Sequence, residues 1–416
     1  MDDAYPAPAT YRFKWNGQVP DLAILPDTFA PFLTSVRRYL HARPEIGYQE
    51  KETHQFIRRH LEMAGLTVVG PLAKTGLYVD IVGGHPGPKI GYRSDMDALP
   101  IQDGKSVPYR SQHDGVAHLC GHDAHMTVAL GVALLLQHLR DQIHGSVRVF
   151  FQPNEEGTPS GSVPMIKAGV LEGLEAVYCI HADPTLDVGV YGLITGPVTA
   201  SSDRLRACIR AKRTGHSARP HQAKDTIWIA NLLLNQFYQY IGRITDARNG
   251  AVLTVCMFKG GITHNVIPSE VTFEGTLRCL NRDDRTNLKA LMRQTAEQLA
   301  ALHGVSIDLE FTSSMSSVLN DQRLVQNVRN TIEQLFGPEA SFDIPVPSMG
   351  SEDFAHYLEY LPGMLARVGT ASGIWSRLPL HDNQFDLDDA CLQPAVRLMS
   401  QALMNHLRLG ILQERA

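Results

Sequence analysis

Features that would direct a chain to a membrane, a nucleic acid or the secretory route are missing from this sequence of 416 residues. The longest apolar runs, near Val128 to Leu136, are far shorter than the roughly 18 residues of a membrane-spanning helix. No lysine and arginine run suggests a nucleic-acid or lipid surface, and the net charge is −5. The opening stretch, MDDAYPAPATYRFKWNGQVP, lacks the basic and apolar segments of a secretory signal. We expect a cytoplasmic protein that binds a small molecule, with no nucleic-acid or membrane partner.

Cysteine is sparse, and no close spacing suggests a disulfide framework. The six cysteines are scattered, at Cys120, Cys179, Cys208, Cys256, Cys279 and Cys391. In a reducing compartment most of them should be free thiols. The composition, with 44% hydrophobic and 19% charged residues, is typical of a globular protein. A chain of this length exceeds what one hydrophobic core organises, so two domains are expected.

The first half of the chain alternates predicted helices with predicted strands. Apolar residues at helical spacing predict helices that begin at Asp27, span 52–65, begin near Asp123 and span 163–170. Runs rich in β-formers predict strands at 77–82, 89–92, 147–151 and 177–180. This alternation predicts an α/β domain with a largely parallel sheet.

Residues 203–311 are predicted to have a different order of strands and helices. Strands are predicted at 203–213, 251–259, 270–279 and 305–311, with helices at 222–243 and 283–303. The order β-α-β-β-α-β is that of a ferredoxin-like α+β sandwich. The chain then returns to helices and short strands. The sequence therefore predicts a discontinuous catalytic domain, 1–198 and 314–416, with a ferredoxin-like domain inserted at 199–313.

Polar clusters follow three predicted strands, at the edge where parallel sheets bind ligands. SDMDALP follows 89–92, QPNEEG follows 147–151 and HADP follows 177–180. Cys120 and His122 lie just before a predicted helix, and both are donors that suit Zn²⁺ or a similar metal. Alone, this pair fits a buried thiol beside a capping histidine equally well. His118 and His125 flank the loop and could orient its ligands.

Two adjacent acids, Glu155 and Glu156, come directly after an apolar strand. Neighbouring side chains of an extended segment point in different directions, so one could bind metal while the other faces a substrate. A solvated acidic turn is the alternative. However, a buried strand end is a costly place for unpaired carboxylates, and a nearby cation would remove that cost. His181 and His381 lie in two further polar segments, HADP and LPLHDNQFD.

Eight ordered motifs resemble the amidohydrolase branch of the dinuclear aminoacylase/carboxypeptidase metallopeptidase family. The motifs are RSDMDALPIQ, HLCGHDAH, FQPNEEG, HADP, GHSARPH, GGITHNVIP, GSEDF and HDNQFDLDD, within a resemblance from about Arg37 to Asp389. That branch contains hippurate hydrolases, N-acyl-amino-acid amidohydrolases and plant auxin-conjugate hydrolases. The resemblance implies a zinc-exopeptidase-like catalytic domain and an inserted lid and dimerisation domain, and hence a homodimer or higher homo-oligomer.

The resemblance also implies roles for individual residues. It makes Cys120 a thiolate shared by two divalent metal ions, with other ligands at His122, Glu156, His181 and His381. Glu155 would be the general base, which takes a proton from the attacking water and returns it to the leaving amine. Asp97 would be a supporting acid. Zn²⁺ is the expected metal, although Mn²⁺, Ni²⁺ or Co²⁺ could use the same donors.

In the inserted domain, the resemblance makes His216 and Asn265 contacts for the substrate. His216 would donate a hydrogen bond to the tetrahedral oxyanion, whereas ordinary turn chemistry is the alternative for both residues. Arg278 is a candidate for a bidentate contact with a substrate carboxylate. Leu119 stands where relatives carry a small residue, and Asn154 where alanine is usual. Both departures leave the ligands intact and could alter the pocket.

The expected activity is metal-dependent hydrolysis of the amide bond of a small N-acyl amino acid or a similar amide. The same machinery also fits a dipeptidase, a carbamoylase or an aromatic-amine deaminase. A non-catalytic binding member of the family is a further hypothesis. Loss of Glu155 or of a metal ligand would indicate that last hypothesis, and the sequence retains all of them.

Overall fold

The computed structural model describes residues 29–412, which divide into two compact units. The first contains the described residues up to Gly196, together with Leu319–Pro345 and those from His356 onward, and the second contains Pro197–Val318 and Val346–Ala355. The second unit thus includes Val346–Ala355, which the sequence analysis had assigned to the catalytic segment 314–416. The Ala200 N–H donates to the Ser348 carbonyl at 2.9 Å and helps attach this segment. The predicted helix start at Asp27 and the opening stretch MDDAYPAPATYRFKWNGQVP lie outside the described residues.

The first unit is built on an eight-stranded sheet of order β1-β2-β4-β3-β5-β16-β6-β15. Its strands are β1 Val68–Leu72, β2 Gly76–Val82, β3 His85–Asp95, β4 His144–Gln152, β5 Ala176–Asp187, β6 Tyr191–Leu193, β15 Ser341–Asp343 and β16 Gly363–Ala371. The four central strands β4, β3, β5 and β16 are parallel, whereas β1 and β2 are antiparallel to their neighbours. The prediction of an α/β domain with a largely parallel sheet is confirmed.

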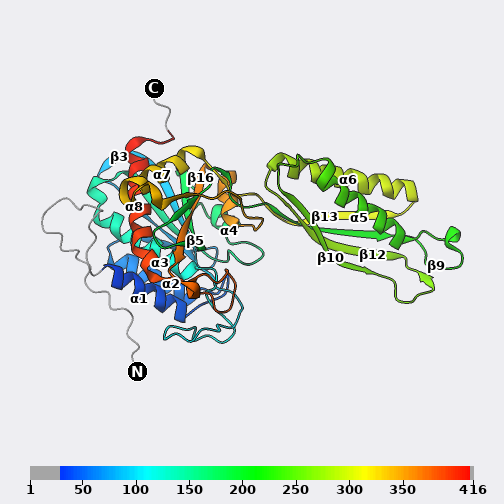
Figure 1. Cartoon of the computed structure of the whole chain (residues 1–416), viewed down its shortest axis with the longest axis horizontal. Coiled ribbons are helices and arrows are strands. Elements are labelled where there is room, and N and C mark those ends of the chain that lie inside the picture. Colours follow the sequence, from blue (N-terminus) through cyan, green and yellow to red (C-terminus); the bar gives the residue numbers. More distant parts are fainter. Residues whose placement is uncertain (1–28, 413–416) are drawn as a thin grey trace. The chain divides into compact units, whose positions relative to one another are not determined.

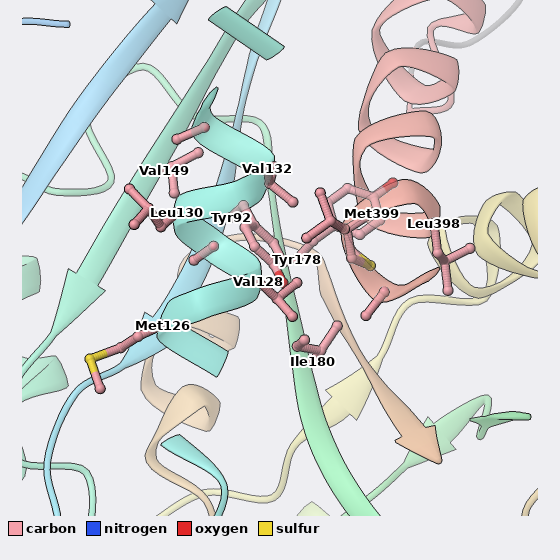
Figure 2. Close-up of a cluster of buried hydrophobic side chains, with 14 of the residues drawn as sticks. Tyr92, Met126, Val128, Leu130, Val132, Val149, Tyr178, Ile180, Leu398 and Met399 are labelled. Atoms are coloured by element: carbon pink, nitrogen blue, oxygen red, sulfur yellow. The ribbon is translucent and has the colours of Figure 1, made fainter. Parts of the chain in front are cut away.

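Helices pack around this sheet, and α3 is the most completely buried. The helices are α1 Phe29–Ala42, α2 Lys51–Met63, α3 His122–His138, α4 Ser162–Lys167, α7 Gln322–Phe336 and α8 Leu392–Leu409. Every residue of α3 from His122 to Leu136 is buried, because the helix contacts the sheet as well as α1 and α8. Figure 2 shows Val128 and Val132 of α3 close to Met399 of α8. This packing holds the first turn of α3, which carries His122, in a fixed place.

The second unit is a two-layer sandwich with its own hydrophobic core. Its main elements are β8 Ser202–Arg210, α5 Thr226–Arg243, β10 Ala251–Gly260, β12 Glu270–Cys279, α6 Arg282–His303 and β13 Ser306–Met315. The sheet is antiparallel in the order β10-β12-β8-β13, and α5 and α6 cover one face of it (Figure 1). This confirms the ferredoxin-like prediction. Short strands are β9 Gly215–His216 and β11 Val266–Ile267, and β7 Gly196–Pro197 and β14 Leu319–Asn320 lie where the chain passes between units.

The helix predicted at 222–243 begins later than expected. Residues Pro220–Gln222 form a separate 3-10 turn, and α5 starts only at Thr226. The Asp225 carboxylate accepts the backbone N–H groups of Ile227 and Trp228, both at 3.1 Å, and so caps the helix there. Among residues 29–412, no helix is both long and apolar enough to cross a membrane. All six cysteines lie within residues 29–412, and none of them forms a disulfide there.

Candidate metal centre

The five predicted metal ligands lie together in the first unit. Two groups of possible ligand atoms share Cys120: one adds His122 and His181, and the other adds Glu156 and His381. Within each group the atoms lie within 4.8 Å of one another. Cys120 Sγ is 3.7 Å from His181 Nε2, and His381 Nε2 is 3.1 Å from Glu156 Oε1. The arrangement offers two adjoining donor sets with one thiol in common.

Local backbone geometry brings these ligands within reach. Gly121, between Cys120 and His122, has φ +86°, and a Cβ atom there would lie 2.8 Å from the Cβ of Ala182 on β5. Only glycine therefore allows this close approach without displacement. The backbone N–H of His381 donates to the Leu119 carbonyl at 2.8 Å, which ties the two ligand loops together. One prediction is corrected: His181 lies within β5, which runs on to Asp187, and does not follow a strand ending at 180.

Backbone carbonyls orient two of the histidine rings. Nδ1 of His122 lies 2.9 Å from the Asp97 carbonyl oxygen, and Nδ1 of His181 lies 2.8 Å from that of Ala182. Because a carbonyl oxygen only accepts, both Nδ1 atoms must donate, which leaves Nε2 for a ligand. The buried Nε2 of His122 has no hydrogen-bond partner within residues 29–412. An unsatisfied buried nitrogen of this kind fits a metal ligand.

The protonation of the ligands also fits a cation site. Burial raises the pKa of the Cys120 thiol to about 12, although His122 opposes this. Burial alone would lower the pKa of His122, but the Asp95 carboxylate and its neighbours raise it overall. Burial likewise tends to raise the pKa of Glu156, but the hydrogen bond from His381 and the nearby charges of His122 and His381 together outweigh burial and lower the pKa. A divalent cation would replace the protons on sulfur and imidazole, since thiolate and neutral imidazole are the binding forms.

Asp97 fixes the two adjacent glutamates. Its Oδ1 accepts the Glu155 N–H at 2.9 Å, and its Oδ2 accepts the Glu156 N–H at 3.0 Å. Its carbonyl also orients His122, as described above. The carboxylates of Glu155 and Glu156 lie with the His122 ring within 4.8 Å. Asp97 thus orients both acids, which supports the predicted role of a supporting acid.

Asp95 is a member of the site that the sequence analysis missed. Its Oδ1 lies 2.8 Å from His125 Nδ1, and its Oδ2 accepts from Arg93 at 2.8 Å and lies 3.8 Å from His122 Nε2. His125 Nε2 in turn accepts the Ala182 N–H at 2.9 Å. Both ring nitrogens of His125 are therefore engaged, so this residue orients the site and is not a free ligand. The motif DMD, with two acids at alternate positions, was the available signal for Asp95.

A buried ionic network supports the ligand loops from behind. The guanidinium of Arg37 on α1 contacts Asp123 at 2.8 Å and Asp386 at 2.6 Å. Asp123 follows the ligand His122, and Asp386 lies on the segment that carries His381. Further members are His41, Tyr109 and Asp389. The network therefore joins α1 to two segments that supply ligands.

Asn154 stands where alanine is usual in the motif, and the local backbone explains this difference. Its backbone has φ +51°, a left-handed conformation that asparagine tolerates better than alanine. Its backbone N–H donates to the Glu50 carboxylate at 2.9 Å, and its side-chain amide donates to the Pro159 carbonyl at 2.7 Å. These bonds hold the loop that carries Glu155.

The three predicted substrate contacts lie in the second unit. His216 on β9 pairs with Val266 on β11, and the Ser217 N–H donates to the Asn265 carbonyl at 3.0 Å. His216 and Asn265 are therefore close together, and both are exposed. Arg278 donates to the Met349 carbonyl at 2.9 Å. Contact of these residues with a substrate stays a prediction.

Comparison with known proteins identifies the family. The model of Peptidase family M20/M25/M40 matches residues 91–405. The chain belongs to this family. It is 37% identical to an N-acetyl-L-cysteine deacetylase of Bacillus subtilis, over 81% of this chain and 80% of that protein. It is 36% identical to an N-acyl-L-amino acid amidohydrolase of Geobacillus stearothermophilus, over 68% of this chain and 76% of that protein.

A solved structure agrees with this assignment. A dinuclear metal binding peptidase of the M20 family from Bacillus subtilis has a TM-score of 0.80 and 32% identity, over 92% of this chain and 99% of that chain. The predicted resemblance is confirmed. This M20-family protein is a hydrolase of the amidohydrolase type, and its clustered donors suit divalent metal ions.

Proposed function

We propose that this M20-family protein hydrolyses the amide bond of small N-acyl amino acids, with two divalent metal ions as cofactors. The observation that carries the proposal is the pair of donor sets that share the Cys120 thiol beside Glu155. The substrate class is supported by the relatives named N-acetyl-L-cysteine deacetylase and N-acyl-L-amino acid amidohydrolase. A cytoplasmic location belongs to the same proposal.

Each residue around the candidate metal centre has a separate role in hydrolysis. When bound, the two cations would supply Lewis-acid activation of a water molecule and of the amide carbonyl. Glu155 takes the proton from the attacking water and delivers it to the departing nitrogen, so that the products are a carboxylate and an amine. Asp97 holds Glu155 in place through its backbone N–H. His216 donates to the oxyanion, and Asn265 and Arg278 bind the rest of the substrate.

We propose Zn²⁺ as the metal, held by Cys120, His122, Glu156, His181 and His381. Sulfur and imidazole donors favour Zn²⁺, while Mn²⁺, Ni²⁺ and Co²⁺ can use the same set. Cys120→Ser replaces the shared thiol by a poor ligand, so the metal content per chain should fall. Elemental analysis after dialysis measures it. An unchanged stoichiometry would contradict the shared role of Cys120.

A hydrolysis screen of the metal-loaded protein tests the proposed reaction. The panel contains N-acetyl, N-benzoyl and N-indolylacetyl amino acids, dipeptides, N-carbamoyl amino acids and aromatic amines. Turnover of the N-acyl amino acids, abolished by a chelator and restored by Zn²⁺, is the expected result. Turnover confined to dipeptides, carbamoyl compounds or aromatic amines would favour those activities instead. No turnover of any member would favour a non-catalytic binding protein.

We also propose that the protein is a homodimer formed through the second unit. Strand β10 is an outer strand of that sheet, and it carries Val252, Met257 and Phe258, which are 42%, 40% and 44% exposed. An exposed apolar edge strand is suited to pairing with a second copy. Light scattering should give the mass of a dimer, and Met257→Lys should shift it toward the monomer. A monomeric wild-type protein would refute this assembly.

A further inference from the structure

Arg367 lies beside the candidate metal centre on a neighbouring strand. Strands β5 and β16 run parallel, and their register pairs Arg367 with the ligand His181. Paired residues of adjacent strands point to the same face, with strands spaced about 5 Å apart. His181 is buried, whereas Arg367 is partly exposed to solvent. A guanidinium group that solvent can reach therefore adjoins the centre within the first unit.

Other cations around the centre are already paired with acids. The pairs are Arg93 with Asp95, Arg37 with Asp123, Lys105 with Asp103 and Arg377 with Asp187. By contrast, the Arg367 side chain makes no ion pair or side-chain hydrogen bond with any residue between 29 and 412. Its charge is not neutralised by the described part of the protein.

The residues paired with Arg367 on its two neighbouring strands are His181 and Gly192, and neither is an anion. On β6 its paired residue is Gly192, and a Cβ there would meet the apolar side chains of Ile344 and Leu186. On β5 the acid two residues beyond His181 is Asp183, whose Oδ1 already accepts from the Thr185 hydroxyl at 2.6 Å and the Thr185 N–H at 2.9 Å. Arg367 therefore has a histidine on one side and an apolar surface on the other.

A positive charge at this point is unfavourable unless an anion joins it. Two divalent cations at Cys120 and its neighbours would repel the guanidinium, and the repulsion falls only slowly with distance in a partly dry site. The register of β5 and β16 places Arg367 on the strand next to the ligand His181, at the paired position. An anionic group of a bound ligand would relieve this repulsion.

We propose that Arg367 binds the free carboxylate of the substrate and thereby selects N-acyl amino acids over neutral amides. The inference rests on the proposed function, because the free carboxylate that Arg367 would recognise is a group of N-acyl amino acids. Arginine and carboxylate form two parallel charge-assisted hydrogen bonds, which fix orientation as well as adding affinity. Because Arg367 belongs to the same unit as the metal ligands, this contact needs no residue of the second unit, and it assigns the carboxylate to Arg367 in place of Arg278.

Kinetics on a matched acid and amide test the proposal. Wild type and Arg367→Leu are compared on N-acetyl-L-methionine and on N-acetyl-L-methioninamide, which lacks the negative charge. We expect KM for the acid to rise by about 10-fold to 100-fold, the range of a lost charge-assisted bond, with kcat little changed. The kinetic constants for the amide should not change. An equal fall in kcat for both substrates would assign Arg367 to the oxyanion instead, and unchanged constants for the acid would also refute the proposal.

Controls separate binding from structure. Arg377→Leu removes a cation of the same unit that is paired with Asp187, and it should leave the ratio of acid to amide turnover unchanged. Arg367→Lys keeps the charge and should restore part of the affinity. Melting temperature and metal content should match wild type in all three variants.

Calorimetry gives a readout that does not depend on turnover. N-acetyl-L-methionine is titrated into metal-loaded protein carrying Glu155→Gln, with and without Arg367→Leu. Weaker binding in the double variant supports the role of Arg367, and equal binding refutes it. If wild type hydrolyses neither substrate, the proposed function fails, while the calorimetric comparison still decides whether Arg367 binds the carboxylate.

Discussion

The buried histidines of the candidate metal centre and the exposed His216 of the second unit are held in opposite ways. In the first unit His122 and His181 are buried, and each donates Nδ1 to a backbone carbonyl at 2.9 or 2.8 Å. In the second unit His216 is exposed, and its Nδ1 only accepts the Ala218 N–H of its own turn at 3.1 Å. The first arrangement is complete before a substrate arrives. The second leaves the imidazole free to take a partner from solution.

This difference follows from where each set lies relative to a hydrophobic core. The ligands of the first unit surround the start of α3, whose apolar side chains are packed on all sides. Polar groups in such a place must be paired, so their orientation is fixed. The second unit has a separate core that includes Phe237 and Phe273, and His216 is not part of it. Substitutions of the buried ligands His122 and His181 should therefore affect stability or metal binding, and substitution of His216 should affect only turnover.

Glu155→Gln should produce the largest loss of activity. Glutamine keeps the shape of the side chain but cannot accept the proton from water, so kcat should fall by about 100-fold to 10,000-fold. Metal content should be retained, because Glu155 is not one of the five assigned ligands. Steady-state kinetics and elemental analysis check this, with Glu52→Gln, an exposed glutamate, as the control. Retained turnover would exclude Glu155 as the base.

Arg37→Met should produce the largest loss of stability. The substitution leaves the carboxylates of Asp123 and Asp386 buried without their cation, which typically costs about 3–5 kcal/mol. Chemical denaturation measures the loss. Arg210→Met is the matched control, since Arg210 pairs with Glu270 at 2.8 Å on an exposed face of the second unit. Screening by solvent makes such pairs weak, so the control should be as stable as wild type. If Arg37→Met and Arg210→Met reduce stability equally, the contrast between the buried ion pairs of the first unit and the exposed ion pair of the second unit is wrong.

His216→Ala should affect turnover alone. Loss of one oxyanion donor typically lowers kcat by about 100-fold, while an exposed histidine contributes little to packing. The melting temperature and the metal content should stay at wild-type values. His221→Ala, another exposed histidine of the second unit, serves as the control. If both variants keep full activity, His216 has no part in the reaction.

The candidate metal ligands lie in short motifs that could be picked out from the sequence, and the resemblance of these motifs to a known family implied their roles. The adjacent acids Glu155 and Glu156, and the pair Cys120 and His122, are local signals that do not require knowledge of distant contacts. The start of α5 was predicted too early, at residue 222, although Asp225 precedes an apolar helical run and caps it. These are features in which neighbours along the chain determine the structure.

Contacts between distant segments could not be predicted in this way. β5 continues past His181 because β16, about 190 residues further along the chain, pairs with it as far as Asp187. The Arg37 network joins α1 to acids at Asp123 and Asp386. A single sequence contains many arginines and aspartates, and nothing in their spacing indicates which of them meet.

The smallest expected effect is on the pH dependence of stability, which compares a buried histidine with an exposed one. His60 on α2 is buried against Phe32 and Phe56, and its Nδ1 donates to the Phe56 carbonyl at 2.8 Å. Burial lowers the pKa of His60 below its ordinary value of 6.5. As the pH falls below that value, the unfolded chain binds a proton that the folded chain does not, so stability is lost.

His60→Leu should reduce this loss between about pH 7.5 and pH 5.5, because leucine binds no proton in either state. Urea midpoints at the two pH values measure it, and the metal centre, common to both proteins, cancels in the difference. His221→Leu, at an exposed site, should leave the pH dependence as it is in wild type. If His60→Leu and His221→Leu change the pH dependence equally, burial is not the cause, and the contrast between fixed and free histidines would not extend beyond the metal centre.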